Sequence, residues 1–156
     1  MLAQVSFARG DALEGARLSH EAADAAAAVG LKWWQGVTLL GAAEEQFRLG
    51  YPEGAEGDLR EAFALLQSVR DLVNLPIALA AGAALAAHNG DSARSGTLWG
   101  AVEAEAERTP RPTTADNLSQ YQPYLTPVLG DAFEEARLRG RALSLEEAVA
   151  YALSID

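Results

Sequence analysis

One kind of turn recurs at an even spacing and constrains the fold more than any other feature of this sequence. Gly10, Gly50 and Gly90 lie 40 residues apart, and each separates two apolar runs with helical spacing. Turn glycines at a fixed interval are typical of a structural repeat in which each unit packs on the next. Alanine, leucine, glutamate and arginine are abundant and runs of β-branched residues are scarce, which favours helix over strand. The sequence therefore predicts an all-α fold of repeated helices.

Glycine and proline also mark where the individual helices begin and end. Gly30 and Gly50 follow apolar runs and are expected to stop helices as C-caps. Pro52 and Pro76 suit the first turn of a helix, where a missing N–H group costs no hydrogen bond, and Asn74 is expected to cap the helix that contains Pro76. The expected helices cover residues 1–9, 12–29, 32–49, 52–70, 75–89 and 91–108.

Apolar residues at steps of three and four predict the buried face of each helix. In the second and third helices these positions are Leu13, Leu18, Ala22, Ala25 and Val29, then Trp33, Val37, Leu40, Ala43 and Phe47. Consecutive helical residues point about 100° apart, so two adjacent tryptophans cannot both face one core. Because Trp33 is on the apolar stripe, Trp34 is the candidate for a partner-facing or groove-lining aromatic residue; the alternative is that it packs on the preceding helix or on an upstream repeat.

Small and large residues recur at fixed distances after the three turn glycines. Positions five after them are small, positions nine after them reach a large residue in two units, and positions twelve after them are mostly small. In chain order they are Gly15, Ala55 and Ser95, then Ser19, Leu59 and Trp99, then Ala22, Ala62 and Val102. Small positions allow two antiparallel helices to cross closely while a large one fills the groove. The pattern resembles the tetratricopeptide repeat (TPR) with longer helices, since that repeat spans 34 residues.

Four prolines change the character of the chain after residue 108. Pro110 and Pro112 cannot continue a helix, and Pro123 and Pro127 are expected to kink or break a helical stretch over residues 114–130. Its expected buried stripe is Leu118, Tyr121, Leu125 and Leu129. Gly130 also falls on the 40-residue interval, but the small and large offsets are not met after it, so we do not count it as a repeat.

A capping box marks the last helix. Ser144 and Glu147 have the spacing in which each side chain bonds the other residue's amide, so a helix is expected from residue 145. We expect it to dock on a short helix over residues 131–139, so that the two form a capping pair. The prediction is a TPR-like α-solenoid of about nine helices, with repeats in residues 1–108 and a C-terminal helical cap of the same domain in residues 109–156.

The charge and the absence of cysteine exclude several classes of partner and compartment. The chain carries 22 acidic and 12 basic residues and a formal charge of −10, so it repels phosphate backbones and is a poor nucleic-acid binder. It contains no cysteine, no membrane-length apolar run and no signal-peptide pattern, which indicates a cytoplasmic protein without disulfides and without membrane contact.

The sequence contains no pattern that assembles catalytic or metal-binding groups. His20 and His88 are the only histidines, and neither has a second ligand at metal-binding spacing. Adjacent acidic residues such as Glu44 and Glu45 diverge on a helix, and no phosphate loop or nucleophile elbow is present. We therefore expect a non-enzymatic chain with no cofactor and no metal.

The C-terminal segment carries the most specific resemblance. Residues 140–153, GRALSLEEAVAYAL, together with LGDAF at 129–133 and LWGAVEA at 98–104, are similar to the TPR-like C-terminal region of large bacterial LuxR-type, AfsR-type and cyclase-linked ATPase regulators. The resemblance implies a sensor or scaffold arm in transcription regulation and signal transduction, attached to upstream ATPase and effector domains.

Two functions follow as alternatives. In the first, the concave face of the repeats binds a protein segment or a small effector, with Trp34, Glu44, Arg48 and His88 as candidate binding residues. In the second, the chain is a structural arm that spaces or oligomerises its parent protein. Homo-oligomers are compatible with both.

Overall fold

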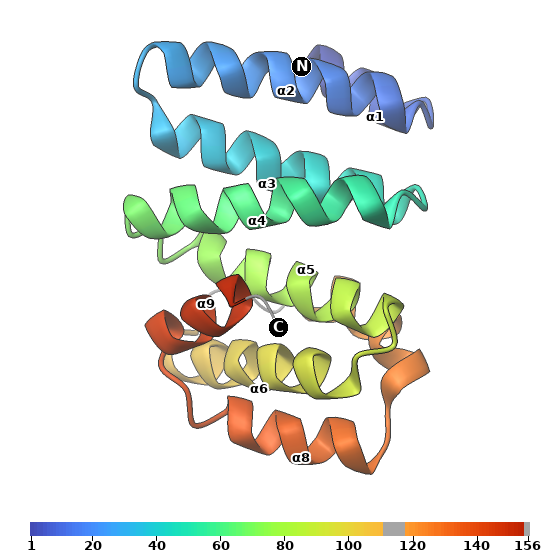
Figure 1. The fold of residues 1–156 in the computed structure, drawn as a ribbon, viewed down its shortest axis with the longest axis vertical. Coiled ribbons are helices and arrows are strands. Elements are labelled where there is room, and N and C mark those ends of the chain that lie inside the picture. Colours follow the sequence, from blue (N-terminus) through green and yellow to red (C-terminus); the bar gives the residue numbers. More distant parts are fainter. Residues whose placement is uncertain (111–117, 155–156) are drawn as a thin grey trace. The chain divides into compact units, whose positions relative to one another are not determined.

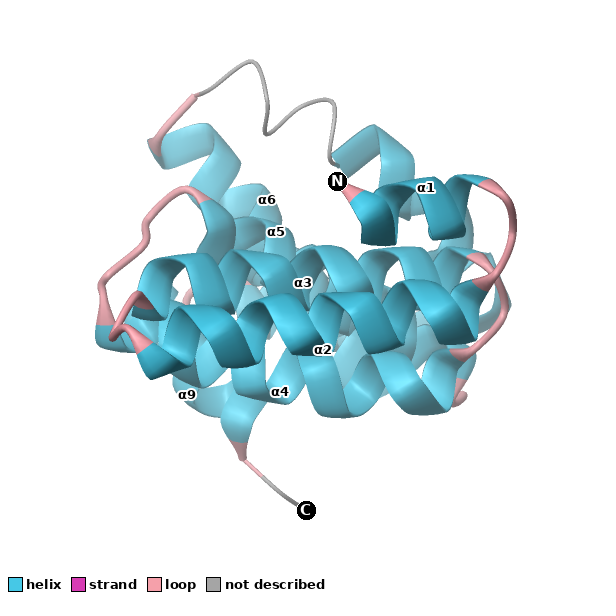
Figure 2. Ribbon diagram, turned by 90° about the horizontal axis from the view of Figure 1, so that it is seen from above, coloured by secondary structure: helices cyan, strands magenta, loops and turns pink. Residues whose placement is uncertain are grey.

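The computed structural model describes residues 1–110 and 118–154, and in these residues the chain consists of helices joined by short turns (Figure 2). The all-α prediction is confirmed. The chain divides into two compact units, Met1–Asp71 and Leu72–Asp156. None of the helices in the described ranges is long and apolar enough to cross a membrane. The predicted boundary at residue 108, between repeats and cap, stays a prediction.

The N-terminal unit contains four helices, in which each packs on the next along the chain (Figure 1). They are α1 (Leu2–Ala8), α2 (Ala12–Ala28), α3 (Lys32–Arg48) and α4 (Pro52–Ser68). The predicted helices of this unit all form, with ends within two residues of the expected ones. Pro52 occupies the first turn of α4, as expected.

The C-terminal unit begins with α5 (Asn74–His88) and α6 (Ser92–Arg108), which pack together. Residues 118–121 are helical and lead into the 3₁₀ helix η1 (Gln122–Val128), which packs on α5. Two short helices, α8 (Asp131–Gly140) and α9 (Leu145–Leu153), complete the unit (Figure 1). The bounded helices agree with the expected number of about nine within the described residues.

The helical turns repeat every 20 residues, which is half of the interval seen in the sequence. Gly10, Gly30, Gly50 and Gly90 have φ between 74° and 84°, and Arg70 has φ 53° at the equivalent place. At each turn the next amide bonds a carbonyl five residues back, from Asp11 to Ser6, Leu31 to Ala26, Tyr51 to Gln46, Asp71 to Leu66 and Asp91 to Ala86. This pattern is the Schellman motif. Arg70 concealed the shorter period, because only four of the five positions are glycine.

The predicted buried face of α2 is wrong. Leu13 is 71% exposed and Val29 69%, and Ala22 and Ala25 are exposed as well, while Leu18 is half-buried. The buried residues are instead small, namely Ala12, Gly15, Ala16, Ser19 and Ala23. The helix packs through a flat face that lets its neighbours approach, so its larger residues point away. Gly15 shows the closeness, because a Cβ there would lie 2.5 Å from the ring of Phe7.

Most of the other small and large positions are buried as predicted. Ala55, Leu59 and Ala62 are buried in α4, and Ser95, Trp99 and Val102 are buried in α6. The hydroxyl of Ser95 donates to the carbonyl of Ala83 over 2.9 Å, which satisfies it inside the core. Of the repeated offsets, only Ala22 fails.

The broken helix around the prolines is confirmed where it is described. Pro123 stands at the start of η1 and Pro127 lies inside it, so the chain forms a short 3₁₀ helix here in place of an uninterrupted α-helix. Tyr121 and Leu125 are buried, Leu118 is half-buried, and Leu129, which follows η1, is 58% exposed. The start of the predicted 114–130 stretch and Pro112 lie outside the described residues.

The expected capping box is present, but the helix that it starts docks elsewhere. Ser144 Oγ accepts the Glu147 amide at 3.2 Å, and Glu147 Oε2 accepts the Ser144 amide at 2.8 Å. This second bond lowers the pKa of Glu147 below its ordinary value. However, α9 packs on α5 and α6, and α8 packs on α6, so the two do not form the predicted capping pair.

The position of α9 is decided by polar contacts at both ends of α6. Arg94, near the start of α6, donates to the carbonyls of Ala152 at 2.6 Å and Ser154 at 3.4 Å. Arg108, at the end of α6, donates to the carbonyl of Leu143. Therefore α9 runs antiparallel to α6, and its last carbonyls are neutralised by a cation.

Candidate interaction surface

Two adjacent tryptophans stand exposed at the start of α3. Trp33 is 43% exposed and Trp34 56%, and their rings meet edge to face with centroids 4.8 Å apart. Trp34, the candidate partner-facing residue, is thus more than half exposed. The placement of Trp33 on the buried stripe is wrong, whereas Leu40 and Ala43 on that stripe are buried.

Two further apolar side chains extend the exposed area across the turn between α2 and α3. Val29, the C-cap of α2, is 69% exposed, and Leu31, the N-cap of α3, is 49% exposed. We call Val29, Leu31, Trp33 and Trp34 the tryptophan surface. Exposed aromatic groups that adjoin other apolar groups are typical of surfaces that bind a partner.

Two carboxylates from the α4 side border the tryptophan surface. The indole N–H of Trp33 donates to Asp71 Oδ2 over 2.6 Å, and Gln35 Nε2 donates to Glu61 Oε1 over 3.0 Å. The first of these bonds holds the Trp33 ring against the end of α4 and leaves Trp34 as the more exposed ring.

Of the binding residues expected from the sequence, Trp34 lies apart from Glu44 and Arg48 on α3. Trp34 lies in the first turn of α3, while Glu44 and Arg48 lie about 15 and 21 Å further along the same helix at 1.5 Å per residue. Glu44 and Arg48 share a helix face, but Arg48 bonds its neighbour Glu45 through two guanidinium nitrogens. His88 is exposed at the end of α5 and belongs to the other unit.

The sequence reading missed a buried polar cluster in the N-terminal unit. Asp58 in α4 is only 7% exposed, and its two oxygens lie 2.6 Å from His20 Nε2 and 2.6 Å from Gln46 Nε2. The carboxylate thus links α4 to α2 and α3. Gly54 makes room for the amide, since a Cβ there would lie 2.2 Å from Gln46 Oε1.

A signal for this cluster existed in the sequence. Gln46 follows Ala43 by three residues and Asp58 follows Ala55 by three, so both polar residues occupy the spacing of buried positions. A polar residue at such a position has to find a partner in the core. His20 therefore has a structural role in the described unit.

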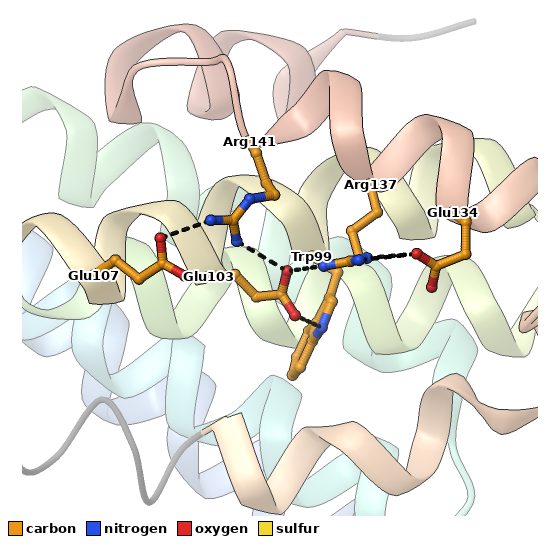
Figure 3. A network of polar contacts seen from close by, with 6 residues as sticks. All are labelled: Trp99, Glu103, Glu107, Glu134, Arg137 and Arg141. Carbon is orange, nitrogen blue, oxygen red and sulfur yellow. Dashed lines mark hydrogen bonds and ion pairs between the residues drawn. The ribbon is translucent and has the colours of Figure 1, made fainter.

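A second polar network, in the C-terminal unit, ties α6 to α8 (Figure 3). Glu103 accepts from Trp99 Nε1 at 3.0 Å and from Arg137 at 2.7 Å, and it pairs with Arg141 at 3.5 Å. Arg141 also bonds Glu107 at 2.6 Å. Arg137 donates hydrogen bonds to the carboxylates of Glu103 and Glu134, and these bonds raise the pKa of Arg137 above its ordinary value.

This network fixes the register of the two helices and orients the buried Trp99. Its charges are already paired with one another, with opposite signs in close contact (Figure 3). A new ligand would have to replace existing ion pairs, so the network is a poorer binding site than the tryptophan surface. No group of three acidic or histidine residues in the described ranges is arranged to hold a metal ion.

Comparison with curated proteins found relatives that are much longer than this chain. Proteins of Mycobacterium bovis and of two strains of Mycobacterium tuberculosis, each named "Putative HTH-type transcriptional regulator", are 30% identical over 156 residues. The match covers 97% of this chain and 17% of each relative. No family model and no solved structure matches the chain. The chain is thus similar to a region of large proteins named as transcriptional regulators.

Proposed function

We propose that this chain is a non-enzymatic binding region of a bacterial transcriptional regulator of the LuxR or AfsR type. In this proposal it forms a TPR-like helical arm, with residues 1–108 as repeats and residues 109–156 as their cap. The arm binds a protein segment or an effector and signals its occupancy to upstream ATPase and effector domains. The similarity to large regulators supports the regulatory setting, and their names refer to regulation and to no enzyme activity.

The tryptophan surface is the observation that carries the binding function. Moving large apolar groups such as Trp33 and Trp34 out of water lowers the free energy of the system. These two side chains nevertheless remain 43% and 56% exposed. Tryptophan is also enriched among the residues that dominate binding energy in protein interfaces. A partner that covers Trp34 would be stabilised in the complex by the burial of this side chain.

The other predicted residues have smaller roles in this proposal. Glu44 and Arg48 share one face of α3 and would contact an extended partner, or a separate effector, about 15 to 21 Å from Trp34. His88 would contribute from the C-terminal unit. Each of these three is tested separately from Trp34.

The binding function is tested with a photo-crosslinking amino acid placed at single positions. The chain carries it at position 34 or, as a matched control, at Leu138, which is 64% exposed on α8. Crosslinked products are identified by mass spectrometry after irradiation in bacterial cells. We expect a defined product at position 34 and none at position 138.

A thermal-shift screen with metabolites tests the effector form of the same proposal. An effector that binds the native state raises the unfolding midpoint by mass action. If position 34 forms no specific product and no metabolite shifts the midpoint, the binding proposal is refuted.

The structural arm is the second candidate, and one observation favours it. Leu2, Val5 and Leu13 on α1 and α2 are 71%, 43% and 71% exposed, and such residues are typical of faces on which another helix packs. If the chain is such an arm, changing Leu13 to serine alters its self-association in light scattering, while the photo-crosslinker at position 34 captures no partner.

A further inference from the structure

The charged side chains that are hydrogen-bonded to Trp33 and to Gln35 are both carboxylates. Asp71 Oδ2 accepts the indole N–H of Trp33 at 2.6 Å, and Glu61 Oε1 accepts Nε2 of Gln35, the residue after Trp34, at 3.0 Å. An indole N–H and an amide N–H carry no charge, so these two bonds cancel none of the negative charge on either acid. The tryptophan surface therefore lies beside two acidic groups.

Glu61 is the carboxylate that a cation from a partner can reach. Its side chain is exposed on α4, and among the ion pairs of residues 1–110 and 118–154 none includes it. Hydrogen bonds between a charged donor and a carboxylate are about twice as strong as those between neutral groups. A basic side chain near Trp34 thus has an acceptor available.

The basic residues nearest in the sequence do not reverse the sign of the charge here. Lys32 leaves α3 about 200° around the helix axis from Trp34, so it starts from the opposite side of the helix. Arg70 precedes Asp71 in the turn after α4 and is exposed. With both of them counted, the N-terminal unit has 11 acidic and 6 basic residues and a formal charge of −5. The field of the whole unit therefore favours a cation.

Trp34 supplies an aromatic face on which a cation is stabilised. The ring is 56% exposed, and it meets the Trp33 ring edge to face at an interplanar angle of 76°. The face of an indole ring carries a negative partial charge and attracts a guanidinium or an ammonium group. Arginine suits this surface better than lysine, because its planar group stacks on an aromatic ring and also bonds a carboxylate through two N–H groups.

We propose that the partner of the tryptophan surface is a basic protein segment whose arginine stacks on Trp34 and pairs with Glu61, while apolar side chains of the segment cover Val29 and Leu31. The inference rests on the proposed function of this surface as a binding site and names the chemistry of its partner. An acidic segment or a phosphate backbone is repelled by the two carboxylates, and an uncharged apolar segment gains nothing from them.

Two labelled peptides of matched design measure the preference for positive charge. One alternates leucine and arginine, the other has glutamate in place of every arginine, and neither contains tryptophan. Fluorescence anisotropy with the wild-type chain gives a dissociation constant for each. We expect the arginine peptide to bind at least about tenfold more tightly than the glutamate peptide, and its affinity to fall as the salt concentration rises, because salt screens exposed charges.

Single substitutions separate a specific site from a general attraction to an acidic protein. Trp34→Ser is expected to weaken binding of the arginine peptide at least about tenfold, and Glu61→Gln about threefold, the effect of one exposed ion pair. Glu56→Gln is the matched control, because it removes the same charge from an exposed position on α4, about 7.5 Å along the helix axis from Glu61. It is expected to leave the affinity unchanged. Circular dichroism confirms that each variant keeps the wild-type fold.

The outcomes separate this inference from the proposed function. The inference is overturned if the two peptides bind equally, if neither binds, or if either Trp34→Ser or Glu61→Gln weakens the arginine peptide no more than Glu56→Gln does. The segment crosslinked from position 34 gives an independent reading, since mass spectrometry reports its sequence. A captured segment with a net positive charge supports the inference. A captured segment without one overturns it, while the proposed function holds because a partner still binds at position 34.

Discussion

Changing Gly100 to alanine tests whether the C-terminal unit depends on the backbone contact between α6 and α8. A Cβ at Gly100 would lie 2.0 Å from the carbonyl oxygen of Arg137, and one at Gly140 would lie 2.0 Å from that of Thr97. Gly96 also faces backbone, at 2.3 Å from the oxygen of Phe133. The two helices are therefore in contact through their main chains.

The magnitude follows from the shift that the extra methyl group requires. The helices have to separate by about 1.4 Å to restore an ordinary contact of 3.4 Å. Such a shift stretches the 2.7 Å bond between Arg137 and Glu103 beyond hydrogen-bond length and loosens the buried Phe133. Overpacking costs about 3 kcal/mol at the upper end of its usual range, while alanine gains about 1 kcal/mol in helix propensity over glycine. We expect a net loss of about 2 kcal/mol.

Thermal unfolding measures this loss in the C-terminal unit. Trp99 fluorescence reports on α6 when Trp33 and Trp34 are replaced by phenylalanine, and a loss of about 2 kcal/mol lowers the midpoint by about 8–16 °C. Gly57→Ala in α4 is the matched control, because nothing lies within 4 Å of its added Cβ. It is expected to stabilise the N-terminal unit by about 0.5–1 kcal/mol. If Gly100→Ala is neutral or stabilising, the close crossing of α6 and α8 is incorrect.

Three further predictions concern turns, packing and pH. Arg70→Gly is expected to stabilise the N-terminal unit by about 1 kcal/mol in urea unfolding, because φ 53° is costly for any residue with a Cβ; a loss of stability would contradict the turn geometry. Ala62→Phe is expected to unfold or splay α3 and α4, since Ala62 is 0% exposed, whereas Tyr51→Ser, at 46% exposed, is expected to matter little; melting curves in the reverse order would refute the packing. The pKa of Glu147 is lowered below 4.5 by the Ser144 amide, so its contribution is present above that pH and is lost as the pH falls through the lower folded pKa. The stability difference between wild type and Glu147→Gln is therefore expected to shrink in acid, and a difference that is constant from pH 7 to about pH 3 would contradict this.

Features decided by neighbouring residues were readable from the sequence. The helix ends at Gly10, Gly50 and Gly90 and the capping box at Ser144 depend on backbone conformation within one turn, so residue type alone indicates them. Helical periodicity also placed Trp34 off the apolar stripe that contains Trp33, and Trp34 is 56% exposed. Its role in binding stays a prediction.

Features that depend on distant residues required the tertiary structure. On α2 the apolar pattern predicted that Leu13 is buried. The neighbouring helices approach so closely that only small residues fit between them, and Leu13 is exposed. His20 and Asp58 are 38 residues apart, and no local pattern indicates that α2 reaches α4. Arg94 likewise decides where α9 docks through carbonyls 58 and 60 residues away.

The sequence by itself determined the helices, their turns and the all-α class, because hydrogen bonds within a helix and its caps join residues at most five positions apart. Only the tertiary structure decided which face each helix buries, because burial depends on the shape of the facing helix. It also decided that the indole N–H of Trp33 donates a hydrogen bond to Asp71, which lies 38 residues further along the chain. The candidate surface is thus a local sequence feature whose border is supplied by a distant turn.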